Sequence, residues 1–510
     1  MGLFTRLGRS LVDGLVDSLM KRMLTDPYPE NLFAMVPIMN KVHVMNVIET
    51  GMRAETGKPL SRPLGSPFVL SDWQKILVNP VHLFRMPTPD GVQIDTSVVI
   101  GPRAARPLKL DIPILITGMS YGGALNLQVK LALAKGASLA GTATNTGEAP
   151  LVPEERQAAE RLIGQYNRGG WLNNDPDLAK LDAIEIQLGQ GAQAAAPMST
   201  PEWMTGPDYR EAFHLRPEQD AVIHTRLPGV DSPEDFIHLV SRLRKTHGVP
   251  VGLKICATHH LERELEIALK AGIDFFVVDG AEGGTHGGPT ILQDDVGLPT
   301  LHALVRTVRY IERAGMKDAV SIIAAGGLVS PGHFFKALAL GADAVYIGTI
   351  ALLATLHTQM TKALAFEPAP QVALYTGRYS EDFDIEEGAR DLANFLRSCV
   401  REMELTTYAL GKTTFSQLDR SDLCTVDPEI ARFCGIDYAG CAPDEQPAWA
   451  AMEAAASPAG SARHREDRIR ANGRAGDGDG LTAGTARKAR GRARLERPLP
   501  TARRPDDRNP

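Results

Sequence analysis

The chain has 510 residues, of which 43% are hydrophobic and 23% are charged, as in an ordinary globular protein. Residues 461–510 contain 14 Lys and Arg against 7 Asp and Glu, a net charge of +7, so residues 1–460 carry −13 of the formal net charge of −6. Because the body of the chain is acidic, it lacks the basic footprint of a nucleic-acid-binding protein, and no nucleic acid is expected as a partner.

The cysteine pattern and the length of the apolar runs indicate the cellular compartment of the protein. The chain has five cysteines, an odd number, and none forms a C-x-x-C pair. This pattern predicts free thiols in a reducing compartment, and without zinc or iron–sulfur spacing no metal is expected. No apolar run reaches the roughly 18 residues that span a bilayer, and no signal-peptide pattern is present. We therefore expect a cytoplasmic protein.

Residues 1–26 are expected to form an amphipathic N-terminal helix. Between residues 3 and 24 leucines recur every four residues, and the other side of the helix carries Arg6, Arg9, Lys21 and Arg22. Such a helix either docks on the rest of the chain or on a sister subunit of a homo-oligomer, or it lies on an anionic membrane surface. The second alternative would make the protein membrane-peripheral.

Residues 112–384 have the pattern of a (β/α)8 TIM barrel of the α/β class, and the Pro-rich residues 27–111 are expected to cover one of its faces. Helical segments separate eight short runs that are apolar and β-branched, as expected of parallel strands buried on both faces. The predicted strands are Ile112–Thr117, Ser138–Thr144, Ala183–Leu188, Asp220–His224, Pro250–Cys256, Asp274–Asp279, Ser321–Ala325 and Asp343–Gly348.

The remaining chain is predicted to be helical and then disordered. Residues 385–445 are expected to form C-terminal helices, because the apolar residues between Leu392 and Val400 fall on one helical face. Residues 457–510 contain Gly, Pro, Ala and Arg but no aromatic residue. Such a segment does not bury enough apolar area to order itself, so we expect a disordered basic tail.

Glycine-rich segments follow the last two predicted strands, at Ala325–Ser330 and Ile347–Thr349. In a (β/α)8 barrel the loops after strands seven and eight bind phosphate, and glycines let backbone N–H groups approach it. These segments therefore predict a phosphorylated cofactor or substrate.

Polar and small residues follow the earlier strands as well. The small residues of Gly118–Asn126 either admit a flat ring or form a plain tight turn, and Glu148 either meets a substrate or caps a helix. Gln190 and Gln193 offer donors and acceptors to a heterocycle edge, or belong to a solvated loop.

Two further strands carry residues that are unusual in such places. Lys254 lies inside an apolar strand, where a lysine is costly unless it meets an anion, either a bound ligand or Asp279. His286 lies in the glycine-rich run Asp279–Pro289, which is typical of a loop that covers a substrate. A histidine of this kind is by itself more often structural than catalytic.

In order and spacing these segments resemble the FMN-binding synthase domain of glutamate synthase, and the resemblance extends over most of residues 27–440. The segments that carry it are Pro113–Gly122, Asn145–Glu148, Gln190–Gln193, Lys254, Asp279–Thr285 and Ala325–Gly327. The resemblance implies FMN in the barrel mouth and reductive amination of 2-oxoglutarate to glutamate through 2-iminoglutarate.

The resemblance also implies residue roles. FMN would be held by Met119, Ser120, Gln190, Lys254, Gly326, Gly327, Gly348 and Thr349. By the resemblance the substrate would meet Glu148. From their places in the chain, we also expect Arg168, Gln193, Gly283, Gly284 and Thr285 to bind the substrate. Lys254 would balance charge on the flavin, and Glu148 with His286 would transfer protons.

The chain departs from the family pattern at several points. Thr349–Gly377 contains no cysteine, where full-length enzymes place three for an iron–sulfur cluster, and no glutaminase domain or N-terminal cysteine is expected. Gln193 stands where a lysine is common, and Ala149-Pro150 replaces the usual glycines. No strand–GxGxxG–helix unit is visible, so we expect a separate electron donor, a ferredoxin or a reductase subunit.

The sequence thus predicts an FMN-dependent oxidoreductase that aminates a 2-oxo acid. Two alternatives remain open. One is an FMN-dependent oxidoreductase acting on hydroxy or amino acids, with Arg168 as the anchor of the substrate. The other is a non-catalytic flavin-binding protein that is associated with a membrane through residues 3–24.

Overall fold

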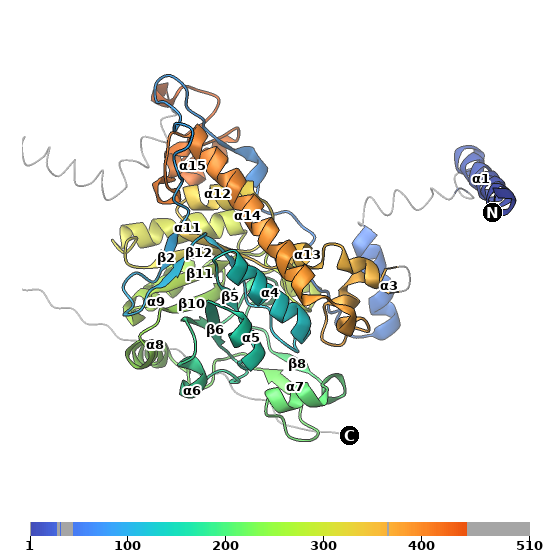
Figure 1. Ribbon diagram of the computed structural model, residues 1–510, viewed down its shortest axis with the longest axis horizontal. Helices are drawn as coiled ribbons and strands as arrows, with labels where there is room; N and C mark the ends of the chain where they lie inside the picture. The colour runs from blue at the N-terminus through green and yellow to red at the C-terminus, as the bar shows by residue number, and fades with distance from the viewer. Residues whose placement is uncertain (1, 28–30, 32–43, 365–366, 446–510) are drawn as a thin grey trace, which may run out of the picture. The chain divides into compact units, whose positions relative to one another are not determined.

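The computed structural model describes residues 2–27, 31, 44–364 and 367–445 (Figure 1). The tail predicted over residues 457–510 lies outside the described residues. Helix α1 (Gly2–Thr25) covers the helix predicted over residues 3–24. No helix in the described part of the chain is long and apolar enough to cross a membrane.

A parallel eight-stranded barrel forms the body of the fold. Its strands are β4 (Ile114–Ile116), β5 (Thr144–Asn145), β6 (Leu162–Tyr166), β7 (Ala183–Gln187), β10 (Val251–Cys256), β11 (Phe275–Asp279), β12 (Ser321–Ala325) and β13 (Ala344–Ile347). They pair in the order β4-β13-β12-β11-β10-β7-β6-β5, and the Ile116 N–H donates to the Ala143 carbonyl at 3.0 Å across the seam between β4 and β5. This arrangement confirms the predicted α/β barrel.

Two of the eight predicted strands were wrong. The segment Asp220–His224 contains β9 (Ala221–Ile223), which pairs antiparallel with β8 (Met198–Thr200) outside the barrel. Its middle residue is exposed, as in a two-stranded ribbon and unlike a strand buried on both faces. The missing barrel strand is β6, whose Gly164 and Gln165 interrupt the apolar run. The run Ser138–Thr144 also begins inside α4 (Leu127–Leu139), and only its last residue belongs to β5.

Helices surround the strands, as Figure 1 shows. They are α4, α5 (Pro153–Ala158), α6 (Asp175–Leu178), α8 (Pro233–His247), α9 (Leu261–Ala271), α11 (Thr300–Arg313), α12 (Pro331–Ala339) and α13 (Thr349–Leu356). The start of α8 follows from its sequence: Ser232 and Asp235 form a reciprocal capping box, and Pro233 occupies the first turn. Gly248 ends this helix in a left-handed conformation, which glycine adopts without strain.

The barrel interior is closed at its amino end by a hairpin from the N-terminal layer. Strands β2 (Val98–Ile100) and β3 (Leu108–Leu110) pack with the interior side chains of Leu115, Phe275 and Tyr346 in one buried apolar cluster. Gly101 lies against Pro250, where a Cβ atom would come within 2.6 Å of the proline ring. Because this end is filled, the opposite end is left for ligands.

The segments flanking the barrel join each other through a small sheet. Strand β1 (Ile76–Val78) pairs with β14 (Leu423–Thr425), which pairs with β15 (Asp437–Tyr438). The predicted C-terminal helices therefore include only α14 (Ile385–Ala409) and α15 (Pro428–Cys434) in addition to short 3-10 turns. Helix α14 packs on α4 at Gly136, where a Cβ atom would meet the Ala389 carbonyl at 2.9 Å.

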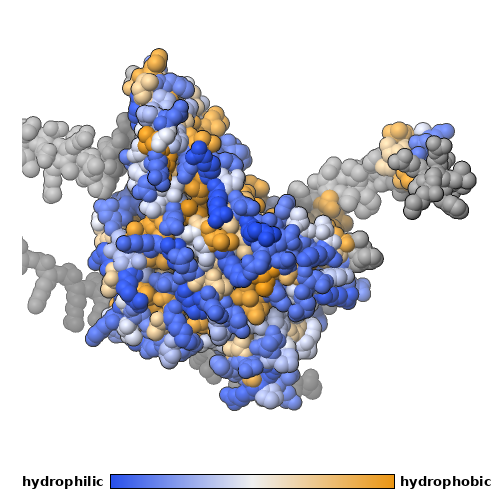
Figure 2. Space-filling view, in the orientation of Figure 1, coloured by the Kyte–Doolittle hydropathy of each residue, from blue (hydrophilic) through white to orange (hydrophobic). Residues whose placement is uncertain are grey.

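The described chain contains further helices outside the barrel ring. They include α3 (Val44–Thr56), α7 (Pro207–Ala212) and α10 (Thr290–Asp294). Hydrophilic residues predominate on the face shown in Figure 2, with smaller apolar areas between them. All five cysteines are free.

Candidate functional site

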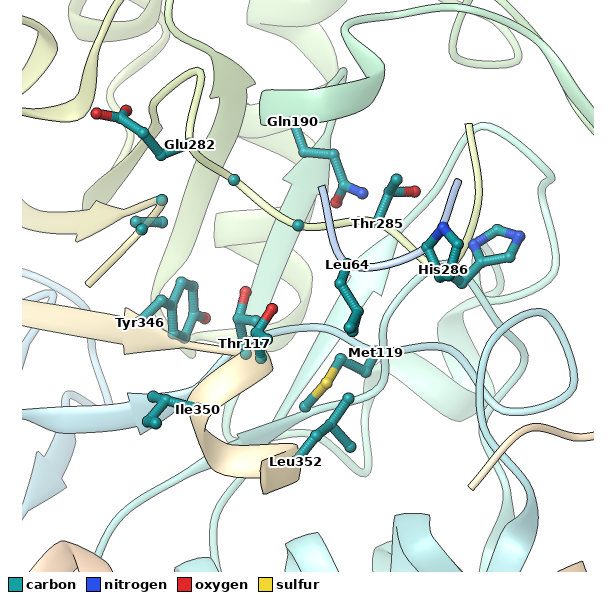
Figure 3. Close-up of a pocket in the computed structure, with 18 of the residues that line it drawn as sticks. Leu64, Thr117, Met119, Gln190, Glu282, Thr285, His286, Tyr346, Ile350 and Leu352 are labelled. Atoms are coloured by element: carbon teal, nitrogen blue, oxygen red, sulfur yellow. The ribbon is translucent and has the colours of Figure 1, made fainter. Parts of the chain in front are cut away.

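A cavity of about 550 Å³ opens at the carboxyl ends of the barrel strands (Figure 3). Every residue proposed from sequence for a site role lines it, apart from Arg168. The lining includes Met119, Ser120, Glu148, Gln190, Gln193, Lys254, Gly283, Gly284, Thr285, His286, Gly326, Gly327, Gly348 and Thr349. These residues come from segments far apart in the chain, and the parallel strands bring their ends to one edge.

Lys254 is a buried ammonium group at this cavity. Its Nζ lies 3.2 Å from Asp279 Oδ2, donates to Thr117 Oγ1 at 3.3 Å, and stands 5.9 Å from the centre of the Tyr346 ring. Burial acts to lower the pKa of Lys254, but the nearby carboxylates of Asp279 and Glu185 offset this effect, so the pKa is raised above its ordinary value. The side chain is therefore charged at neutral pH.

A second carboxylate lies inside the barrel. Glu185 accepts hydrogen bonds from the Tyr346 hydroxyl at 2.9 Å and from Gln165 Nε2 at 2.7 Å, and Asn145 Nδ2 donates to the same hydroxyl at 3.2 Å. Burial, followed by the charge of Glu185, raises the pKa of Tyr346 well above its ordinary value. The phenol is therefore a fixed hydrogen-bond donor.

Glu148 and Arg168 form a buried pair beside the cavity. Arg168 Nε lies 3.2 Å from Glu148 Oε1, and the two side chains are 0% and 8% exposed. Burial raises the pKa of Glu148 although Arg168 and Lys254 oppose the shift. Glu148 lines the cavity, whereas Arg168 does not. Arg168 Nη1 donates to the Ala196 carbonyl at 3.2 Å, and Arg168 Nη2 is buried without a hydrogen-bond partner.

The two glycine-rich segments form a cradle of bare backbone. Gly326 and Gly327 have φ of 106° and 65°, and a Cβ atom at Gly327 would lie 2.6 Å from the Glu282 Cβ. Gly348 precedes α13, and no side chain caps the N-terminus of this helix. Exposed N–H groups at a helix start favour an anion, and the absent side chains let it approach.

Several buried polar atoms of the cavity lining have no hydrogen-bond partner. Gln193 Nε2 and Thr285 Oγ1 are buried without a hydrogen-bond partner, while Gln190 Nε2 donates to Gln193 Oε1 at 3.1 Å. Both residues line the cavity, as does Glu282, whose Oε1 is also buried without a partner. Because a buried polar atom without a partner is costly, these atoms favour a ligand with hydrogen-bonding groups.

His286, in the loop after β11, is mostly covered by neighbouring groups. Burial lowers its pKa to about 4, so its imidazole is neutral at physiological pH and is a weak base. The loop is tied to the N-terminal layer, since the Leu64 N–H donates to the Thr285 carbonyl at 2.8 Å. The layer thus reaches both ends of the barrel: β2 and β3 at one, and Leu64 at the cavity (Figure 3).

Sequence reasoning missed two buried ionic groups that shape the site. Lys130 on α4 lies 2.8 Å from Glu155 and donates to the Met119 carbonyl at 2.8 Å and to the Asn145 carbonyl at 3.0 Å. It therefore joins the loops after β4 and β5. Glu185 gave the same signal as Lys254, a charged residue within an apolar strand, and could have been found by it.

Comparisons with known proteins decide the family. A model described as the conserved region in glutamate synthase matches residues 87–413. The glutamate synthase large subunit-like protein of Rhizobium meliloti (strain 1021) is 33% identical over 365 residues, which are 68% of this chain and 82% of that protein. The chain belongs to the glutamate synthase family. It is accordingly an oxidoreductase.

Other relatives are longer than the matched region. The archaeal-type glutamate synthase [NADPH] of Thermotoga maritima is 32% identical over 327 residues, and the chain spans 64% of its length. Among solved structures, a flavocytochrome b2 mutant with pyruvate bound is similar with a TM-score of 0.45 and 17% identity, over 71% of this chain and 80% of that chain. A lactate oxidase from Pediococcus acidilactici has a TM-score of 0.46 and 16% identity, over 70% of this chain and 84% of that chain.

Within the described residues, no group of three or more His, Cys, Asp or Glu side chains is placed to hold a metal ion.

Proposed function

We propose that the protein is an FMN-dependent oxidoreductase that reductively aminates a 2-oxo acid, the reaction that turns 2-oxoglutarate into glutamate in the enzymes after which the family is named. The observation that carries the proposal is the buried ammonium group of Lys254, which stands in the same cavity as the bare backbone of Gly326 and Gly327. A cation and a phosphate cradle in one cavity suit the two ends of FMN.

The residues present fit FMN. A cavity of about 550 Å³ falls in the range of cofactor sites. The phosphate would be held at Gly326, Gly327, Gly348 and Thr349, where a Cβ atom on Gly326 would come within 2.7 Å of Thr300 Oγ1. The flavin ring would be held by Met119, Ser120, Gln190 and Lys254. When bound, FMN supplies the hydride that reduces a carbon–nitrogen double bond.

The side chains of the cavity have separate tasks in this proposal. Lys254 stabilises negative charge on the reduced cofactor. Glu148, whose pKa is raised by burial, retains a proton more readily than an exposed carboxyl group and donates it to the substrate nitrogen. Arg168 positions Glu148 from behind, because it hydrogen-bonds the carboxylate without lining the cavity.

The proton-transfer role expected of His286 from sequence is replaced by a role in orienting the substrate. His286, with a pKa of about 4, is a poor base, so we propose that it orients the substrate through hydrogen bonds, together with Gly283, Gly284 and Thr285. Oxidation of hydroxy acids would need a base and an arginine that reaches the substrate, and Arg168 pairs with Glu148 and does not line the cavity. We therefore favour amination.

Electrons would come from a separate donor, a ferredoxin or a reductase subunit. A homo-oligomer and contact of α1 with a membrane surface also remain predictions.

The test begins with cofactor retention. Purified protein is incubated with FMN or with riboflavin, freed of excess ligand and examined by absorption spectroscopy. The phosphate cradle predicts that FMN is retained and that riboflavin, which lacks the phosphate, is lost. Failure to retain FMN would refute the proposal.

The second step tests the direction of the chemistry. The holoenzyme is reduced with dithionite under anaerobic conditions and mixed with a 2-oxo acid and ammonium. Reoxidation of the flavin with formation of the amino acid supports amination. Reduction of the oxidised holoenzyme by hydroxy or amino acids would favour the oxidase alternative, and inertness in both directions would favour a non-catalytic flavoprotein.

A further inference from the structure

One side of the cavity is apolar and continues along α13 beyond Thr349, the last of the predicted FMN contacts in the chain. It is lined by Leu352, Leu353 and Leu356 of α13, by Met360 and Pro370 of the two 3-10 turns that follow, and by Leu374 just after the second turn. In Figure 3, Met119 and Leu352 project from this side, Gln190 and Thr285 project from the other, and Leu64 is drawn between them. We call the six residues the apolar annex.

The rim of the annex is apolar as well. Phe68 is 44% exposed and Leu353 is 44% exposed, although both line the cavity. Apolar surface in a polar active site costs free energy unless a ligand covers it. The annex therefore favours an apolar group in the ligand.

The charges of the cavity point the same way. Its lining in the described chain carries the carboxyl groups of Glu148, Asp279 and Glu282 but only one lysine or arginine, Lys254, which Asp279 already pairs at 3.2 Å. His286 is neutral at physiological pH because its pKa is about 4. A dicarboxylate such as 2-oxoglutarate needs a second cation, and a buried carboxylate without one is strongly disfavoured.

Neutral donors remain for a single acidic head. Gln193 Nε2 and Thr285 Oγ1 are buried, line the cavity and have no hydrogen-bond partner. Together they offer one donor to the carboxylate and one to the keto group of a single 2-oxo acid head. The six side chains of the annex offer a second carboxylate neither charge nor donor.

From these observations, and resting on the proposed function, we propose that the substrate is a monocarboxylic 2-oxo acid with an apolar side chain. Its carboxylate and keto group meet Gln193 and Thr285, and its side chain fills the apolar annex. The 2-oxo acid and ammonia lose water to form the imine. Two electrons and one proton from reduced FMN, with one further proton from Glu148, convert the imine to the amino acid, and an external electron donor restores reduced FMN.

Turnover of the dithionite-reduced holoenzyme tests the substrate class. With ammonium present, 4-methyl-2-oxopentanoate and phenylpyruvate should reoxidise the flavin. Their apparent second-order rate constants should exceed that of 2-oxoglutarate by at least about tenfold, a ratio that a complementary apolar pocket supplies. A 2-oxoglutarate value equal to or above theirs would overturn the proposal.

Binding to the oxidised holoenzyme, measured by titration calorimetry, separates the ligand class from the reaction. The unreactive analogue 4-methylpentanoate should bind at least about tenfold more tightly than glutarate. If no 2-oxo acid is turned over but this preference holds, the proposed reaction is wrong and the ligand class stands. Equal binding of the two acids overturns the ligand class whatever the turnover.

Two variants test whether the annex causes the preference for 4-methylpentanoate over glutarate. Leu352→Gln should weaken 4-methylpentanoate binding by about tenfold and leave acetate binding unchanged, because acetate is too short to reach the annex. Leu405→Gln is the matched control, since Leu405 is a 54% exposed leucine on α14 outside the cavity lining. Equal effects of the two variants on 4-methylpentanoate would contradict the assignment. Gln193→Lys, which supplies the missing cation, should raise glutarate affinity.

Discussion

Replacing Lys254 with methionine tests whether the cavity contains a desolvated ion pair. Methionine keeps much of the apolar stem but removes the ammonium group, so Asp279 loses a partner at 3.2 Å and Thr117 loses a donor at 3.3 Å. The lysine and aspartate side chains are 2% and 7% exposed, and solvent therefore compensates little for the loss.

The expected cost follows from this burial. Breaking a buried pair by removing one partner destabilises a protein by about 3–5 kcal/mol, because the remaining charge is uncompensated. The upper half of that range applies here, since Glu185 and Glu148 also lie close enough to raise the Lys254 pKa. In the double variant Lys254→Met with Asp279→Asn, both charges are gone and most of the loss should be recovered.

Urea unfolding of the apoprotein measures these effects, and the double-mutant cycle gives the coupling between the two residues. Lys270→Met is the control, because Lys270 lies 2.6 Å from Glu266 but the two side chains are 63% and 55% exposed. It should leave the unfolding midpoint unchanged. An equally small effect of Lys254→Met would refute the inference that the ammonium group is desolvated.

The same variant separates a structural lysine from one that acts on the flavin. In the reconstituted protein, loss of the cation should make the reduction potential of FMN more negative, because reduced flavin carries the negative charge that Lys254 stabilises. A lower stability with an unchanged potential would restrict Lys254 to a structural role.

Three further predictions concern the cradle, the covering loop and the buried helix pair. Gly327→Ala should reduce FMN retention at least about tenfold because its Cβ would lie 2.6 Å from Glu282, whereas Gly315→Ala, with φ 67° and nothing within 4 Å, carries comparable backbone strain and should retain FMN; equal retention by both variants would count against the cradle. The pKa of His286 is about 4 in the fold against an ordinary 6.5, so its neutral form stabilises the protein above pH 6.5 and this contribution, at most about 3 kcal/mol, is lost as the pH falls towards 4. Urea unfolding between pH 7 and pH 4 should show a shallower decline in His286→Asn than in the parent, and parallel declines would contradict the assigned burial. Lys130→Met should cost about 3–5 kcal/mol in the same unfolding assay, because Glu155 is left 1% exposed without its cation, and Glu155→Gln in the same chain should restore most of it; a stable single variant would show that the pair is not needed.

The sequence alone determined the class of fold and the edge of the barrel at which the site lies. Runs such as Phe275–Asp279 are apolar throughout because a parallel strand between helices and the barrel interior has no solvent face. Residues that follow these runs meet at one end, so Glu148, Gly326 and Thr349 could be assigned to one cavity before their distances were known. Lys254 was conspicuous because a charge within such a run needs a partner.

Only the tertiary structure decided which strands pair and which buried side chains contact each other. The run Ala221–Ile223 is as apolar as a barrel strand, and only its antiparallel partner β8 places it outside, while Gln165 on β6 is acceptable in the interior because Glu185 accepts its hydrogen bond. The pairing of Arg168 with Glu148 and the apolar annex likewise depend on which distant segments meet. The pattern of apolar residues along the chain predicts which residues are buried. Which partner each buried group meets depends on how the whole barrel packs.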